Sequence, residues 1–203
     1  MRRASAHAAR AALCALTTIL FACHPPVAVR TGGSDPLAAR RTELSAQRDW
    51  SFEGRAALSN GKDAVTVRLE WQQHGSGYVL TLRAPVSGET WRLTSSSEGA
   101  LLEGGGKPPR RGPDAEALLQ RESGLRVPVS ALVDWARGLS HDPARAETAL
   151  DERGRPELIR ESGWQIRIRE YDEAVTPARP RSLEAEKAPY RVRLAIASWQ
   201  LGS

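Results

Sequence analysis

Few side chains in this sequence are of a kind that could carry out chemistry. Its four histidines are His7, His24, His74 and His141. No cysteine follows residue 23, so a transition-metal site with the usual His and Cys ligands is not expected. A G-x-S-x-G sequence is absent, and Gly104–Gly106 lacks the lysine and following helix of a phosphate loop. A Ser-His-Asp arrangement stays open, since triad residues need not be neighbours in sequence, but we expect no enzyme, metal or cofactor.

Cys23 is the residue whose surroundings suggest a modification. Residues 1–10 carry three arginines and no acid, and residues 11–22 are mostly apolar, which is typical of a secretory signal. The apolar part is too short for a membrane-spanning helix, which needs about 20 residues. Residues 20–23 (LFAC) resemble a lipobox, in which the cysteine is acylated before cleavage. We therefore expect residues 1–22 to be a cleaved signal peptide and Cys23 to carry the lipid. His24, where aspartate would mark inner-membrane retention, favours the outer membrane.

The charge of the chain argues against nucleic-acid binding. The full sequence has 29 basic and 24 acidic residues and a net charge of +5. Removing the three arginines of the signal leaves 26 basic residues against 24 acidic. The remaining arginines are scattered among Glu and Asp along the sequence, so a basic stripe is not expected.

The rest of the chain has the length of one domain with a core of its own. Residues 23–36 are rich in Pro, Gly and Ser and predict a flexible tether that begins at the lipidated cysteine. Residues 37–203 then form the folded part, and residues 37–48 within it are compatible with a short helix.

Apolar residues alternate with polar ones over most of the folded part. Runs of this kind cover residues 55–59, 65–71, 78–82 and 91–102, with glycine-containing turns between them. Period-two alternation with a polar opposite face predicts an antiparallel sheet that is wet on one side. The alternation resumes after Asp151, at 158–159, 164–168 and 190–196, while the Pro-rich residues 175–189 suggest an irregular edge. Beyond residue 196 the apolar parity changes, which predicts a β-bulge near Ala197.

Two helices interrupt the strands. Asp114 is a suitable N-cap for the first helix and Gly124 a suitable terminator. Pro128 suits the first helical position of the second helix, whose apolar residues recur at helical spacing up to Gly138.

Tryptophan is the abundant aromatic, with six residues against two phenylalanines. Five of the six lie in or beside expected strands, and Trp135 lies on the second helix. Large aromatics are common in ordinary cores. They would equally suit a curved sheet whose apolar face, covered by helices, encloses a cavity, and periodicity does not decide between the two.

Several short segments of the chain form a recognisable series: 52–55 (FEGR), 70–73 (EWQQ), 78–85 (YVLTLRAP), 132–138 (LVDWARG), 163–166 (GWQI), Tyr171, and 193–196 (RLAI) leading to Trp199. Taken together, over about Asp49 to Leu201, these segments resemble the LolB family of outer-membrane lipoprotein receptors. Each segment is short, but their order and spacing, together with the lipobox, support the resemblance.

The resemblance implies a mainly β fold with some α: an incomplete, unclosed antiparallel β-barrel with helices covering an apolar cavity. It also implies a monomer, anchored in the outer membrane and facing the periplasm, that accepts lipoproteins from the soluble carrier LolA and inserts them without nucleotide or cofactor. We expect the cargo's acyl chains to lie against Trp71, Leu80, Leu82, Trp91, Leu93, Trp135, Trp164, Ile166 and Trp199.

One turn has a specific role in the resemblance. Members of the family carry an exposed apolar residue after the strand that ends here at Ala84, and it is thought to deliver lipid into the bilayer. In this chain the residue is Val86, where leucine is more usual, and Ser87 stands where glycine is common. A turn residue packed on its own hairpin is the alternative reading. The rival function is a lipoprotein of the same fold that binds another lipid or scaffolds an outer-membrane complex, since fold alone does not separate them.

Overall fold

The computed structural model describes residues 35–123 and 128–202, so the expected signal peptide, Cys23 and most of the expected tether lie outside it. The described chain is dominated by antiparallel strands. The strands are β1 (Asp49–Ser59), β2 (Ala64–His74), β3 (Gly77–Arg83), β4 (Thr90–Ser96), β5 (Gly99–Gly104), β6 (Lys107–Gly112), β7 (Glu147–Leu150), β8 (Pro156–Glu161), β9 (Trp164–Asp172), β10 (Arg179–Lys187) and β11 (Tyr190–Leu201).

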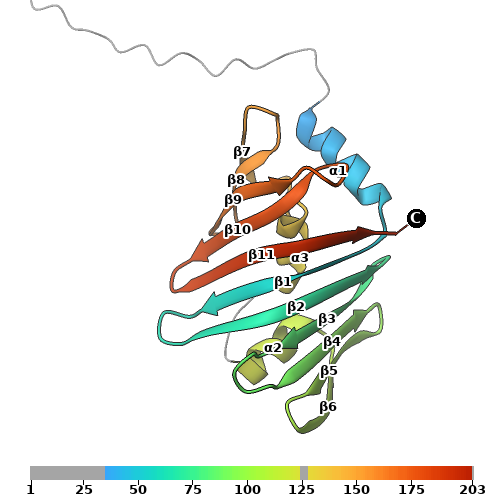
Figure 1. Ribbon diagram of the computed structural model, residues 1–203, viewed down its shortest axis with the longest axis vertical. Helices are drawn as coiled ribbons and strands as arrows, with labels where there is room; N and C mark the ends of the chain where they lie inside the picture. Colours follow the sequence, from blue (N-terminus) through green and yellow to red (C-terminus); the bar gives the residue numbers. More distant parts are fainter. Residues whose placement is uncertain (1–34, 124–127, 203) are drawn as a thin grey trace, which may run out of the picture. The chain divides into compact units, whose positions relative to one another are not determined.

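All eleven described strands belong to one sheet, in the order β6-β5-β4-β3-β2-β1-β11-β10-β9-β8-β7. Neighbours in the sheet are neighbours in sequence except at the centre, where β1 pairs with β11. The edge strands β6 and β7 pair with one neighbour each, so the described sheet is open (Figure 1). The predicted fold class is therefore confirmed.

The central pair contains the predicted bulge. Glu53 lies opposite Ser198 and Gly54 opposite Ile196, so Ala197 is the extra residue, and the prediction is confirmed. A bulge bends its strand and increases the local twist. Gly54 is required at this bend, because a Cβ there would lie 2.4 Å from the carbonyl oxygen of Ala195.

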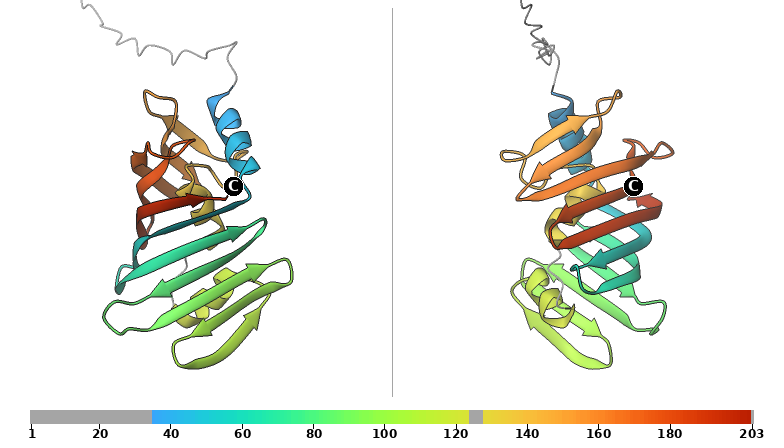
Figure 2. Two further views of the ribbon diagram at one scale, coloured as in Figure 1. Left: turned by 45° about the vertical axis from the view of Figure 1, so that its right-hand side comes forward. Right: turned by 90° about the vertical axis from the view of Figure 1, so that its left-hand side faces the viewer.

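Three helices accompany the sheet in the described residues: α1 (Pro36–Ala46), α2 (Ala115–Ser123) and α3 (Val129–Ala136). Helices α2 and α3 lie on the same face of the curved sheet (Figure 2). Asp114 caps α2 as predicted, accepting a hydrogen bond from the amide of Glu116 at 2.7 Å. Gly138, with a φ of 71°, follows α3. Pro128 is the N-cap of α3 and not its first helical residue, so the helix begins one residue later than predicted. No helix among the described residues is long and apolar enough to cross a membrane.

Buried arginines fasten α1 to the rest of the fold. Nη2 of Arg40 donates to the carbonyl oxygens of Arg137 and Ala178, at 2.8 Å each. Arg137 donates to the carbonyl of Leu44 in the last turn of α1. The fully buried Arg179 donates to the side chain of Gln47, and burial lowers the pKa of Arg179 to about 10.

Three parts of the sheet differ from the prediction. Strand β6 was not among the predicted strands; its Pro108 and Pro109 lack amide donors and are tolerated because β6 is an edge strand. Strand β7 precedes Asp151, so the strands return earlier than predicted. The expectation of an irregular edge at residues 175–189 was wrong, because β10 is an interior strand between β9 and β11. Its prolines lie at or beyond the strand's ends, at positions 177, 180 and 189.

Candidate functional site

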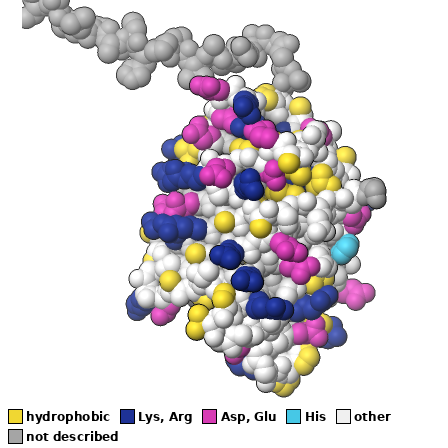
Figure 3. Space-filling view, viewed as in Figure 1, with side chains coloured by type: hydrophobic (Ala, Val, Ile, Leu, Met, Phe, Trp, Pro, Cys, Tyr) yellow, Lys and Arg dark blue, Asp and Glu magenta, His cyan; other side chains and the backbone are white. Residues whose placement is uncertain are grey.

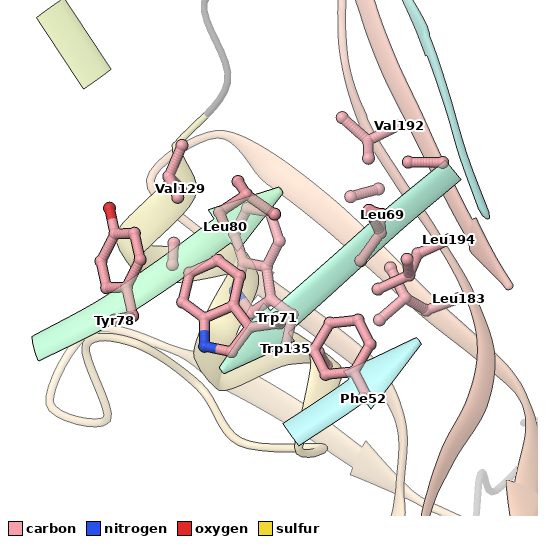
Figure 4. Packing of buried hydrophobic residues seen from close by; sticks show 14 of the residues in the cluster. Phe52, Leu69, Trp71, Tyr78, Leu80, Val129, Trp135, Leu183, Val192 and Leu194 are labelled. Atoms are coloured by element: carbon pink, nitrogen blue, oxygen red, sulfur yellow. The ribbon is translucent and has the colours of Figure 1, made fainter. Parts of the chain in front are cut away.

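An apolar cavity of about 370 Å³ lies between the inner face of the sheet and the helices α2 and α3. Strands β1 to β5 and β11 form one wall, and Leu119, Val129 and Leu132 of the helices form the other. Its apolar strand residues are Phe52, Ala56, Leu58, Val65, Val67, Leu69, Trp71, Leu80, Leu82, Trp91, Leu102 and Leu194. Trp71 and Leu80 lie beside each other, with Val129 of α3 close to Leu80 (Figure 4). The volume lies within the range of about 300–1,000 Å³ that is common for ligand pockets.

The cavity owes its apolar lining to the alternation in β1 to β5. Trp71 pairs with Leu80 across β2 and β3, and Leu69 pairs with Leu82. Successive side chains of a strand point to opposite faces, so residues of one parity gather on the inner face. Several of the lining residues are only partly buried, including Leu58, Leu82 and Trp91. Their incomplete burial leaves an apolar surface available to a ligand.

The polar residues of the lining are Ser87, Glu89 and Glu122. Glu122 of α2 is held by ion pairs to Arg110 and to Lys107, the latter at 3.1 Å. Both basic groups also lie over the ring of Trp91, with Lys107 Nζ at 6.0 Å and the Arg110 guanidinium carbon at 5.8 Å from the ring centroid. These contacts fasten α2 to β4 and β6 beside the cavity.

Val86 lies at the tip of the turn between β3 and β4. Two backbone hydrogen bonds close the turn. The amide of Ala84 donates to the carbonyl oxygen of Glu89 at 2.9 Å, and the amide of Gly88 donates to the carbonyl oxygen of Ala84 at 3.0 Å. Val86 is completely exposed, whereas the other exposed large hydrophobic residues in the described chain, Val65 and Leu201, are 38% and 36% exposed. The geometry therefore excludes packing of Val86 on its own hairpin. Because Ser87 lines the cavity, the exposed valine lies one residue from it.

The structure brings four of the nine expected acyl-chain residues to the cavity: Trp71, Leu80, Leu82 and Trp91. The other five are buried but lie outside its lining: Leu93, Trp135, Trp164, Ile166 and Trp199. The alternation along a strand predicts which side chains are buried on the inner face. It does not show whether the space beside such a side chain is filled by other residues or left as a cavity.

Around these other tryptophans the inner face is filled. Trp135 of α3 packs against Trp164, with ring centroids 5.5 Å apart, and its Nε1 donates to the buried carboxylate of Glu161. Trp199 packs on Phe52 at 4.9 Å, and its Nε1 donates to the carbonyl of Pro180 at 3.2 Å. This part of the molecule is an ordinary core.

Most of the cavity lining was missed by the sequence analysis. Val65, Val67 and Leu69 have the same parity as Trp71, so the alternation contained a signal for them. Leu119 and Leu132 gave no such signal, because a helical apolar stripe does not show which part of a sheet it faces.

Each histidine of the described chain lies near a carboxylate. Nδ1 of His74 lies 3.6 Å from Asp49 and Nδ1 of His141 lies 2.8 Å from Asp134. The His74 side chain is 70% exposed and that of His141 49% exposed, so neither lies in an enclosed pocket. Burial raises the pKa of Asp134. Within residues 35–123 and 128–202, no group of three or more His, Cys, Asp or Glu is placed to hold a metal ion.

The open antiparallel sheet with helices over one apolar face is also found in solved structures of other proteins. A crystal structure of a LolA superfamily protein from Nitrosomonas europaea matches with a TM-score of 0.51 at 10% identity, covering 82% of this chain and 94% of that one. The chain itself belongs to the LolB family, because the model of "Outer membrane lipoprotein LolB" matches residues 48–199.

Curated relatives are similar over most of their length. An outer-membrane lipoprotein LolB from Xylella fastidiosa (strain Temecula1) is 40% identical over 177 residues, covering 86% of this chain and 81% of the relative. That from Xanthomonas campestris pv. campestris (strain B100) is 40% identical over 169 residues, covering 81% and 78%. The family relationship places the chain at the outer membrane.

Proposed function

We propose that this protein is a lipoprotein receptor that accepts cargo from a LolA-type periplasmic carrier and inserts it into the outer membrane. It acts as a monomer, without catalysis or cofactor, and is held at the periplasmic side of the membrane by acyl chains on Cys23. The observation that carries the proposal is the apolar cavity whose lining includes Ser87, next to the completely exposed Val86. The proposed binding site for acyl chains and the residue proposed to enter the bilayer thus meet at the β3–β4 turn.

The energetics explain why such a cavity is needed. Exposing some 30 methylenes of a triacylated cargo to water would cost on the order of 25 kcal/mol, at about 0.8 kcal/mol each. A receptor must shield these groups and still release them to the membrane. A partly open cavity suits this role, because transfer runs toward whichever site binds the chains more favourably.

Filling the cavity tests the binding step. Leu82→Trp places a larger side chain into the cavity, and we expect cargo transfer from the carrier to fall at least about tenfold, or roughly 1.4 kcal/mol. Leu93→Met is the matched control, since Leu93 is buried on the neighbouring strand but does not line the cavity. Binding of a fluorescent fatty acid gives the second measurement. Equal transfer by both variants would show that acyl chains bind elsewhere.

The Val86 turn is tested by measuring pickup and insertion separately. Val86→Glu should leave cargo pickup from the carrier unchanged and reduce incorporation into liposomes, because a charge replaces the residue that enters the membrane. Val86→Leu should preserve incorporation or raise it slightly, since one added methylene contributes roughly 0.8 kcal/mol on burial. Ser97→Glu is the control, adding the same charge in the exposed β4–β5 turn. Undiminished incorporation by Val86→Glu would remove the assigned role.

The cellular role is tested by depletion. If the protein is the receptor, its depletion should leave lipoproteins bound to the periplasmic carrier, as seen on fractionation. Their normal arrival in the outer membrane would instead favour another lipid-binding or scaffolding role.

The role of the anchor is tested separately. Because the cavity and the turn lie in the folded part, a Cys23→Ala protein should keep measurable transfer activity in a purified system. Complete loss would make the anchor part of the mechanism.

A further inference from the structure

Three arginines stand in line across the outer face of the sheet. Strand register places Arg55 of β1 directly opposite Arg68 of β2, and Arg68 directly opposite Arg83 of β3. All three side chains are exposed. Side chains directly opposite each other have Cβ atoms about 4.5–5.5 Å apart, so the guanidinium groups repel one another. We call Arg55, Arg68 and Arg83 the arginine row. In Figure 3 basic side chains form an oblique run across the middle of the outer face.

The row has no acidic partner among the residues that the structure describes. None of its arginines forms an ion pair with any residue in the described parts of the chain. Elsewhere on the same face, Glu184 of β10 lies directly opposite Arg167 and Arg193 of its two neighbours. Its carboxylate is 2.8 Å from Arg193 and 3.5 Å from Arg169. On β9 to β11 four arginines thus form ion pairs with Glu184 or Glu186, whereas the three arginines of the row form none within the described residues.

The row borders a groove of about 560 Å³ on the outer face. Glu53 and Glu70, which oppose each other one step further along β1 and β2, also line the groove. Neither carboxylate forms an ion pair with the row among the described residues, and Glu70 accepts a hydrogen bond from Gln72. The positive surface is therefore a narrow strip, bounded on one side by two acids.

The position of the strip relates it to the membrane. Arg83 is the last residue of β3 and precedes the exposed Val86 by three positions. Guanidinium groups bind phosphate oxygens through paired N–H donors, so they suit phospholipid headgroups. We propose that the arginine row binds the phosphates of anionic phospholipids and orients the Val86 turn toward the bilayer. This inference rests on the proposed membrane contact of Val86.

The proposal differs from attraction by overall charge. After removal of the signal the chain has 26 basic and 24 acidic residues, so its net charge is small. A charge-matched control can therefore separate the row from bulk electrostatics. Arg48, Arg160 and Arg181 are exposed and form no ion pair among the described residues, and none of them is on β1, β2 or β3.

The experiment measures cosedimentation with vesicles. The chain starting at residue 23 with Cys23→Ala, which lacks the lipid, is mixed with vesicles of phosphatidylcholine alone or with phosphatidylglycerol. We expect stronger binding to the phosphatidylglycerol vesicles, weakened by 0.5 M salt. The triple variant Arg55→Gln, Arg68→Gln, Arg83→Gln should lose on the order of a hundredfold of this affinity. The control triple Arg48→Gln, Arg160→Gln, Arg181→Gln should stay near the parent. Thermal unfolding verifies that each variant is folded.

Three results would overturn the inference: no preference for phosphatidylglycerol, equal losses in both triple variants, or undiminished vesicle binding by the row variant. If the row variant keeps vesicle binding but loses affinity for an acidic carrier protein, the row belongs to a protein interface instead. The proposed function fails separately, through normal incorporation by Val86→Glu. Selective binding to phosphatidylglycerol can persist in that case, because it is measured without cargo.

Discussion

The two halves of the sheet differ in how their inner faces are packed and in how the charges on their outer faces are paired. On β8 to β10 the inner face is filled, with Trp135 of α3 packed against Trp164 and with Ile166 fully buried, and on β9 to β11 the outer face pairs four arginines with Glu184 and Glu186. On β1 to β5 the inner face borders the cavity and the outer face carries the unpaired arginine row. The first region fills its inner face and pairs these four arginines, whereas the second leaves apolar surface facing the cavity and the arginine row without an ion pair in the described chain.

The contrast indicates a division of labour within one continuous sheet. Filled cores and paired charges contribute to stability, and they offer little to a partner. Apolar surface facing a void loses packing contacts, and like charges in register repel, so both features cost stability. Both costs fall in the half of the sheet where the proposed ligands would bind, acyl chains on the inner face and lipid phosphates on the outer face.

The largest expected effect lies in the filled half. Trp135→Ala removes a side chain that is 1% exposed and should lower the free energy of unfolding by about 3–5 kcal/mol. It also removes a donor from Glu161, which keeps the amides of His141 at 2.9 Å and Asp142 at 2.8 Å. Urea denaturation measures the loss. Trp135→Phe, which keeps most of the ring volume, should cost less, and a loss below about 1.5 kcal/mol for alanine would contradict the filled-core assignment.

The matched change in the hollow half should be milder for stability. Trp91→Ala removes a partly buried ring that faces the cavity, so we expect a loss of about 1–2 kcal/mol, because fewer atoms surround the ring. Fatty-acid affinity should fall severalfold at the same time, since the ring is part of the lining. Trp164→Ala is the control: it should lose more stability than Trp91→Ala and keep its affinity for the fatty acid, because Trp164 does not line the cavity. Equal losses for the two tryptophans would break the comparison.

Strand alternation predicted the antiparallel sheet, because burial on one face of a sheet repeats every two residues, whereas the open barrel with covering helices came from the family resemblance. The parity change beyond residue 196 was enough to locate the bulge at Ala197. Strand β10 was missed because its prolines suggested an edge, although they lie at or beyond its ends. Propensity describes the strand itself, while its place in the sheet depends on partners distant in sequence.

The site was less predictable than the fold, for a related reason. Trp164 and Trp71 are both buried on the inner face of the sheet, but of the two only Trp71 borders the cavity. The packing of the helices decides which part of the inner face stays unfilled. The arginines seemed scattered among acids, and no basic stripe was expected. That expectation was wrong for Arg55, Arg68 and Arg83, which are 13 or more residues apart and meet only through the register of β1 to β3.

The paired outer face should show a pH-dependent contribution. The hydrogen bond from Arg193 holds the pKa of Glu184 below its ordinary value. A lowered folded-state pKa means that the stabilisation is present above the unfolded pKa and is lost as the pH falls through the folded pKa. Glu184→Gln should therefore cost roughly 0.5–1 kcal/mol at pH 7, and this cost should shrink toward pH 3. Urea denaturation at both pH values tests it, with the exposed Glu157→Gln as control; a cost independent of pH would mean that charge pairing is not its cause.

The unpaired outer face should respond with the opposite sign. Arg68→Gln removes the middle charge of the row and with it both direct repulsions, so the free energy of unfolding should rise by about 0.2–1 kcal/mol. Salt screens exposed charges, and the gain should therefore shrink as ionic strength increases. Arg160→Gln, which removes an exposed arginine elsewhere, should change stability by less than about 0.5 kcal/mol. A loss of stability on Arg68→Gln would show that Arg68 is compensated within the fold. If Arg68 contributes to lipid binding and destabilises the fold, Arg68→Gln should both raise the free energy of unfolding and weaken binding to phosphatidylglycerol vesicles.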